Sequence, residues 1–179
     1  MDVLLIDNND SFTRNLEHLL ASALPGARVA VEPYARLGGL DPAGWDFLVI
    51  SPGPGGPEEY PDHARVLASG RPVLGVCLGM QVINGLCGGR TSPLCGCVHG
   101  RTDVIDWRGR PRTVARYHSL HVSEVGRGLS VLATNAAGVV MALGCRERRL
   151  LGYQFHPESF LTPDGEEFIH DAVEYLGIR

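Results

Sequence analysis

Short apolar runs and amphipathic segments alternate through the first half of the chain. Runs such as Val3-Leu4-Leu5-Ile6 have no polar side, which is typical of strands covered on both faces of a sheet. The pattern predicts strands at 3–6, 28–32, 45–50 and 72–76. Segments with helical apolar spacing predict helices, which we place between Phe12 and Pro25, at 62–69 and at 78–86. Strands that alternate with helices indicate a parallel sheet.

The pattern changes after residue 90, where short β-rich runs are separated by Gly, Asn and Pro, as in hairpins. Strands are predicted at 94–98, 102–106, 112–116, 119–123, 130–134 and 138–143, and a returning strand at 150–155. A last helix is expected to have Thr162 as its cap and Pro163 at its first position. The predicted fold class is therefore α/β, a mainly parallel sheet flanked by helices with a small antiparallel β insertion.

The charged residues narrow the chemistry that this fold can carry. The chain has 179 residues and a formal net charge of −4, which argues against nucleic acid or an anionic membrane as a partner. All 16 basic residues are arginine, and the sequence contains no lysine. A Walker-A phosphate loop and Schiff-base chemistry, including that of pyridoxal phosphate, both require a lysine, so both are excluded.

The cysteines and the N-terminus indicate the cellular compartment in which the protein is expected. Five cysteines are an odd number with no paired framework, and Met1-Asp2-Val3 does not open a signal peptide. Apolar stretches such as 72–80 are far shorter than the ~18 residues that span a bilayer. We therefore expect a cytoplasmic protein with reduced thiols and no membrane partner. The spacing Cys95-x-Cys97-x-His99 is not that of a zinc knuckle, so we expect no metal.

Gly75-Val76-Cys77-Leu78-Gly79 lies between a predicted strand and a predicted helix. This is the thiol version of the nucleophile elbow, in which flanking glycines permit a sharp, strained turn that exposes the central side chain. The helix N-terminus would favour a thiolate at Cys77, and the backbone N–H of Leu78 would lie where an oxyanion forms. The alternative is a buried cysteine in a tight strand–helix turn.

A thiol nucleophile needs a base, and the base needs a partner that orients it. His156-Pro157-Glu158 follows the last predicted strand, and a residue before proline favours extended backbone. Because residues two apart in extended backbone share a side, the imidazole and the carboxylate are expected to lie together, with one ring nitrogen free to face Cys77. The alternative is an ordinary surface turn.

A third candidate segment is the loop Ser51-Pro52-Gly53-Pro54-Gly55-Gly56-Pro57, which follows the third predicted strand. Alternating Gly and Pro give a stiff loop with accessible amides, which can donate a second N–H to an oxyanion. Its position after a buried strand places it near the ligand crevice of an open α/β sheet. The alternative is a plain turn, since Pro-Gly clusters are common in turns.

Taken together, these motifs resemble the class I glutamine amidotransferases, and most closely the glutaminase subunits of anthranilate synthase and aminodeoxychorismate synthase. The resemblance spans essentially the whole chain, as one domain over residues 1–179. It is carried by six segments in the family's order: Ile6 to Thr13, the S-P-G-P-G loop, Gly75 to Gln81, Val98-His99-Gly100, Arg116 to Leu120, and Gln154 to Ser159.

The resemblance implies a flavodoxin-like sheet and a role for each site residue. It implies a catalytic triad of Cys77, His156 and Glu158, and an oxyanion hole at the N–H groups of Gly55 and Leu78. Gln81 would hold the substrate L-glutamine, and its α-amino and α-carboxylate ends would meet the backbone of Tyr117, His118, Ser119 and Leu120. No cofactor is implied. Ammonia would pass to a separate chorismate-binding synthase subunit, as part of a hetero-oligomer.

Several alternatives stay open on the sequence. The chain departs from its closest subfamily at Arg14, Gly56 and Met80, and the stretch between Gly100 and Arg116 is short. These departures leave open a different acceptor enzyme or a stand-alone γ-glutamyl hydrolase. A catalytically silent scaffold is a third alternative, against which the intact set of Cys77, His156 and Glu158 argues. The sequence does not distinguish anthranilate from aminodeoxychorismate as the product.

Overall fold

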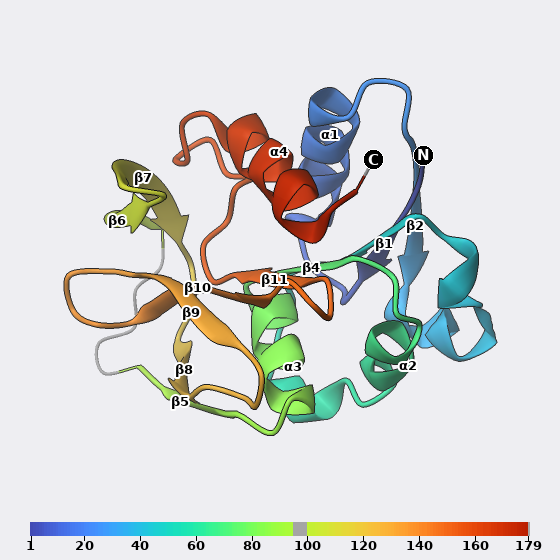
Figure 1. The fold of residues 1–179 in the computed structure, drawn as a ribbon, viewed down its shortest axis with the longest axis horizontal. Coiled ribbons are helices and arrows are strands. Elements are labelled where there is room, and N and C mark those ends of the chain that lie inside the picture. Colours follow the sequence, from blue (N-terminus) through green and yellow to red (C-terminus); the bar gives the residue numbers. More distant parts are fainter. Residues whose placement is uncertain (95–99, 179) are drawn as a thin grey trace.

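A seven-stranded sheet forms the centre of the protein in a computed structural model, which describes residues 1–94 and 100–178 (Figure 1). Its strand order is β2-β1-β3-β4-β11-β10-β9. The strands are β1 (Asp2–Asp7), β2 (Arg28–Pro33), β3 (Phe47–Ile50), β4 (Val73–Val76), β9 (Ser130–Thr134), β10 (Val140–Cys145) and β11 (Leu150–Tyr153). The first five strands in this order pair in parallel, whereas β10 is antiparallel to both β11 and β9.

The parallel part of this sheet has the strand order of flavodoxin-like proteins, so the predicted fold class is confirmed. In such sheets a ligand binds outside the carboxyl ends of the strands, near the point where the strand order reverses. Here that point lies between β1 and β3, the two neighbours that the chain reaches by winding in opposite directions.

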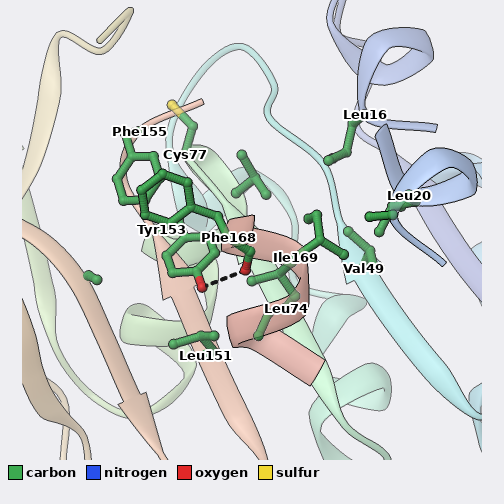
Figure 2. Close-up of a cluster of buried hydrophobic side chains, with 14 of the residues drawn as sticks. Leu16, Leu20, Val49, Leu74, Cys77, Leu151, Tyr153, Phe155, Phe168 and Ile169 are labelled. Atoms are coloured by element: carbon green, nitrogen blue, oxygen red, sulfur yellow. Dashed lines mark hydrogen bonds between the residues drawn. The ribbon is translucent and has the colours of Figure 1, made fainter. Parts of the chain in front are cut away.

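Helices cover both faces of the sheet (Figure 1). On one side lie α1 (Thr13–Ala23) and α4 (Gly165–Leu176), and on the other lie α2 (His63–Ala68) and α3 (Leu78–Leu86). Each side has its own cluster of buried apolar side chains. Figure 2 shows the first cluster, in which the Tyr153 hydroxyl donates to the Phe168 carbonyl at 3.0 Å. None of the helices in the described ranges is long and apolar enough to cross a membrane.

Two antiparallel strand pairs form the predicted β insertion. They are β5 (Arg90–Pro93) with β8 (Leu120–Glu124), and β6 (Arg101–Trp107) with β7 (Arg110–Arg116). The strand predicted at 94–98 falls almost entirely outside the described residues, and so does the Cys95-x-Cys97-x-His99 segment. Three short 3₁₀ helices were not predicted, at Tyr34–Gly39, Pro42–Gly44 and Pro57–Glu59.

The predicted start of the last helix is wrong. Helix α4 begins at Gly165, and the residue before it, Asp164, has left-handed backbone with φ 56°. Thr162 does not cap the helix, because its hydroxyl donates to the His156 carbonyl at 2.6 Å and accepts from the Ala115 N–H at 2.9 Å. A buried tertiary contact has thus taken the side chain that the local pattern assigned to the helix.

Two glycines allow helix α3 to lie directly on the sheet. A Cβ atom at Gly75 would overlap the backbone of Gly79, and a Cβ atom at Gly79 would overlap the Ile50 carbonyl. Neither glycine has positive φ, whereas Cys77 between them has φ 54° and ψ −104°. The glycines are therefore required for close packing, and the backbone strain falls on Cys77 itself. The glycines thus permit the strained turn, as expected, by allowing close packing and not by taking up positive φ themselves.

Gly79→Ala is expected to lower the free energy of unfolding by about 1–3 kcal/mol, because the added methyl group pushes α3 away from β3. Gly44→Ala is the matched control, since nothing lies within 4 Å of the position that its Cβ would take. Urea denaturation of both variants measures the difference. Equal effects of the two substitutions would show that the packing at Gly79 is not under constraint.

Candidate active site

Four strands of the parallel sheet deliver polar residues to one edge. Asn8 follows β1, Ser51 follows β3, Cys77 follows β4 and Gln154 follows β11. Because the strands are parallel, these residues leave the sheet at its carboxyl edge, where ligands of open α/β folds bind. Ser51 and Gln154 are fully buried, and Asn8 is nearly so.

Cys77 joins β4 to α3 in an unusual backbone conformation. Its φ of 54° and ψ of −104° lie outside the regions that non-glycine residues ordinarily adopt. Its N–H donates to the Tyr153 carbonyl at 2.7 Å, and its carbonyl accepts from the Gln81 N–H at 3.2 Å. Such strain costs on the order of 1–3 kcal/mol and persists only where the surroundings impose it. In Figure 2 the sulfur lies at one end of the apolar cluster, beside Phe155.

His156 and Glu158 form a buried pair. His156 Nδ1 and Glu158 Oε1 are 2.6 Å apart, and the two side chains are 3% and 0% exposed. They meet across a turn, in which the Ser159 N–H donates to the His156 carbonyl at 3.3 Å, and not along extended backbone as expected. The predicted proximity is confirmed, but a different local geometry produces it.

Aromatic rings and one strand fix the orientation of the imidazole. The centroids of the Phe12 and Tyr117 rings lie 5.2 and 5.0 Å from that of His156. The His156 N–H donates to the Ala115 carbonyl at 3.1 Å, so its backbone is attached to β7. The remaining ring nitrogen, Nε2, is buried and has no hydrogen-bond partner within residues 1–94 and 100–178. It is therefore free to exchange a proton with a reacting group.

The charges around His156 favour its protonated form. Burial disfavours the imidazolium, but the charges and hydrogen-bonding groups of Cys77 and Glu158 outweigh burial and raise the pKa of His156 well above its ordinary value. The effect of Cys77 requires that its sulfur lies close to the ring. The surroundings of the ring therefore favour the imidazolium form of His156.

One glutamine side chain contacts the sulfur, and a second glutamine contacts the first. Gln154 Nε2 lies 3.7 Å from Cys77 Sγ, in the geometry of a weak hydrogen bond. Gln81 Nε2 donates to Gln154 Oε1 at 3.1 Å and to the Leu120 carbonyl at 3.2 Å. The amide group of Gln81 thereby links the start of α3 to the first residue of β8.

A small pocket of about 180 Å³ opens onto Cys77. The predicted oxyanion and substrate residues all lie in its wall. The lining residues are Gly53, Pro54, Gly55, Cys77, Leu78, Gln81, Tyr117, His118, Ser119 and Leu120. A larger hollow of about 450 Å³ lies between Pro57 and Ser92, but among the described residues neither cysteine nor histidine lines it. The smaller pocket is therefore the better candidate for a site of chemistry.

Charged residues behind the pocket hold its 117–120 wall in place. Arg116 Nε donates to His118 Nε2 at 3.1 Å, which assigns the His118 proton to Nδ1, 2.8 Å from the Leu120 carbonyl. Burial, assisted by the Arg116 charge, lowers the pKa of His118 to about 4, so the ring is neutral. Arg116 also donates to Asp103 at 2.8 Å. This network anchors the backbone of the wall to strand β6.

Three contributors to the site had no role assigned from the sequence. Phe12 packs on His156, Gln154 contacts the sulfur and Thr162 holds the His156 carbonyl. Phe12 and Gln154 belong to motifs that carry the family resemblance, which was the available signal. Thr162 had no such signal, because its position before proline suggested a helix cap.

Comparison with known proteins agrees with this geometry. The family model for glutamine amidotransferase class-I matches residues 4–175. The chain is 40% identical to anthranilate synthase component 2 of Archaeoglobus fulgidus, over 96% of this chain and 97% of that protein. It is 38% identical to the pyocyanine-specific anthranilate synthase component 2 of Pseudomonas aeruginosa, over 99% of this chain and 95% of that protein.

One further relative is much longer than this chain, and one solved structure shares its fold at low sequence identity. The chain is 41% identical to aminodeoxychorismate synthase of Streptomyces griseus, in a match that covers 94% of this chain but only 25% of that protein. The solved structure of a putative GMP synthase subunit from Thermoplasma acidophilum has a TM-score of 0.85, at 20% identity over 99% of this chain and 94% of that one. This last likeness concerns the fold alone. Sequence motifs, fold and family model agree, and the chain belongs to the class I glutamine amidotransferases.

Proposed function

We propose that the chain is a glutaminase subunit, with Cys77, His156 and Glu158 as its catalytic triad, that supplies ammonia to a chorismate-utilising synthase. The observation that carries the proposal is the site of Cys77. The thiol sits on a strained turn at the floor of a pocket, beside an imidazole whose pKa it raises. That imidazole is hydrogen-bonded to a buried carboxylate.

In the proposed reaction the Cys77 thiolate attacks the side-chain amide carbon of glutamine. The N–H groups of Leu78 and Gly55 stabilise the resulting oxyanion, and each such donor is worth ~10²–10³ in kcat. His156 gives its proton to the departing nitrogen, so that ammonia leaves and a γ-glutamyl thioester remains. His156 then takes a proton from water, which attacks the thioester to release glutamate and restore the thiolate. Glu158 orients the imidazole and stabilises its charged form.

The pocket wall suggests how the substrate is held. Both N–H bonds of the Gln81 amide are directed at protein acceptors, which leaves its Oε1 to accept from the substrate. The Ser119 carbonyl already accepts from the Leu94 N–H at 2.7 Å, and the Leu120 carbonyl accepts from His118 and Gln81. The carbonyl groups of Tyr117 and His118 are therefore the better candidates for the α-amino group, and N–H groups of the 117–120 segment are the candidates for the α-carboxylate.

The names of the relatives support a synthase partner. Two of them are component 2 of anthranilate synthase, and the Streptomyces protein contains a matching segment within a longer aminodeoxychorismate synthase. We infer a hetero-oligomer with a chorismate-binding protein, in which residues 1–179 act as one amidotransferase domain. Cys77, Cys87 and Cys145 are free thiols, which suits the cytoplasm.

Cys77→Ser is expected to abolish glutamine-dependent synthesis by the complex and to leave synthesis from ammonium salts intact. Only the step that splits the amide uses the thiolate. Cys145→Ser, a buried cysteine on β10, is the matched control and should retain both activities. Both activities are measured on the same preparations. Glutamine turnover that survives in Cys77→Ser would identify another nucleophile.

Glu158→Gln should reduce glutaminase turnover less than His156→Ala does. The carboxylate acts on the imidazole, whereas the imidazole itself moves the proton, a contribution worth ~10²–10⁴ in rate. Steady-state release of glutamate measures both variants, with circular dichroism to show that they remain folded. Equal losses in two folded variants would contradict this division of roles.

The raised pKa of His156 is expected to fall in Cys77→Ser. The wild-type shift exists because Cys77 and Glu158 together outweigh burial, which by itself lowers the pKa. Without the thiolate, the opposing effect of burial gains weight, so the imidazole should lose its proton at a lower pH. Titration of the His156 ring signals by NMR measures the change. An unaltered His156 pKa in this variant would show that Cys77 and His156 do not form an ion pair.

A further inference from the structure

A further buried histidine, His63, contacts Asn8, which is hydrogen-bonded to the loop that carries Gly55. It is the first residue of α2, and its side chain is 0% exposed. Its Nε2 lies 2.8 Å from Asn8 Oδ1, and its Nδ1 is buried with no hydrogen-bond partner in the part of the chain that the structure describes. The proposed mechanism gives this titratable group no role, and neither do the motifs that carry the family resemblance.

The hydrogen bonds around Asn8 determine the state of the ring. Asn8 Nδ2 donates to the Ser51 carbonyl at 2.9 Å, so its Oδ1 is the atom that faces His63. His63 must therefore carry its proton on Nε2 and donate to Asn8. A second proton would lie on the unpartnered Nδ1, and burial accordingly lowers the pKa of His63 to about 4. The ring is neutral and has one tautomer at neutral pH.

Asn8, which accepts the hydrogen bond from His63, is also bonded to the loop. Its N–H donates to Ser51 Oγ at 2.9 Å, and Ser51 Oγ donates to the Pro52 carbonyl at 2.6 Å. The next residue, Gly53, lies between Asn8 and Leu78 with no space for a side chain. A Cβ there would be 2.7 Å from Asn8 Cβ and 2.6 Å from Leu78 Cδ2. The Asn8 amide thus holds the Ser51 carbonyl, at the start of the segment that brings Gly53 against the first residue of α3.

A tyrosine supports the same loop from beside His63. The Tyr60 hydroxyl donates to the Pro54 carbonyl at 2.9 Å. The His63 ring packs against the rings of Tyr34 and Tyr60, with centroids 5.0 and 6.2 Å away. The loop is therefore held at Ser51, Pro52 and Pro54, immediately before the left-handed Gly55 with φ 75°. Beyond Pro54 the Gly56 N–H donates to Glu59 Oε1 at 2.7 Å, so Gly55 lies between two held residues, and glycine by itself resists rotation poorly.

We propose that His63 is a positioning residue, which acts through Asn8 to hold the Ser51–Gly56 loop where the Gly55 N–H can meet the oxyanion. This inference rests on the proposed glutaminase function and extends it to a residue outside the pocket. Catalytic donors must be held within about 0.5 Å of the productive geometry, and a loop needs supporting hydrogen bonds to achieve this. Loss of the His63 donor would leave Asn8 Oδ1 buried and unpaired, and free the amide to turn.

The test is His63→Phe, which keeps a ring between Tyr34 and Tyr60 but removes the donor. Glutaminase kcat is expected to fall at least tenfold, towards the ~10²–10³ that one oxyanion donor is worth, with little change in KM. Alkylation of Cys77 by iodoacetamide should stay within twofold of the wild-type rate, because that reaction displaces iodide from a saturated carbon and forms no oxyanion. His63→Gln returns an N–H donor and should recover most of kcat.

His170→Phe is the matched control, because His170 Nε2 also lies 2.8 Å from an acceptor, the Ala23 carbonyl, but on the other side of the sheet. It should leave kcat unchanged, whatever it does to the melting temperature. The proposal is overturned if His63→Phe keeps kcat within twofold of wild type, or if alkylation slows as much as turnover. It is also overturned if His63→Gln is no better than His63→Phe.

Tyr60→Phe decides the matter if His63→Phe does not fold. It removes a single hydroxyl from a partly exposed side chain, and a severalfold loss of kcat with normal alkylation supports the proposal, whereas an unchanged kcat refutes it. Failure of the proposed function looks different, since the wild-type chain, alone and with its synthase, would then release no glutamate from glutamine. A fully active His63→Phe enzyme would refute only the proposed role of His63 and would leave the proposed glutaminase function intact.

Discussion

The left-handed backbone of Cys77 is the constraint on which the rest of the site depends. A non-glycine residue keeps φ 54° and ψ −104° only if its neighbours leave no alternative. Here β4 and α3 are both fixed, because the missing side chains of Gly75 and Gly79 let the helix pack against the sheet backbone. The same close approach brings the N-terminus of α3 to the pocket, so one packing contact places both the sulfur and the Leu78 N–H.

A buried pair of charges is the second element of the site, and it depends on the first. Glu158 has no exposed side-chain surface, and an isolated carboxylate there would be costly. His156 offsets that cost through its 2.6 Å contact, and Cys77 also favours the charged imidazole by raising the pKa of His156. The rings of Phe12 and Tyr117 pack against the imidazole of His156 and restrict it to one orientation. The groups around His156 therefore stabilise its charged form, and removing Cys77 or Glu158 is expected to lower its pKa.

The apolar pattern was sufficient to predict the parallel half of the sheet and helix α3, since buried strands such as 3–6 have little other choice of structure. It was insufficient wherever a contact with a residue distant in the sequence determined the hydrogen bonds or the backbone geometry of a segment. Thr162 bonds to His156 and Ala115 instead of capping a helix, and His156 meets Glu158 across a turn. His63 gave no signal in the sequence, because its partner Asn8 is 55 positions away and only the fold brings them together. The pocket residues were found through motifs, whereas the residues that support the pocket required the structure.

The most direct test of the account is to identify the residue that carries the γ-glutamyl group during turnover. The enzyme, with its synthase, is mixed with isotopically labelled glutamine, quenched in acid and digested, and the labelled peptide is identified by mass spectrometry. The account predicts label on the peptide that contains Cys77, and none when Cys77 has been alkylated beforehand. Label on Cys87 or Cys145, or turnover that persists after alkylation of Cys77, would contradict it.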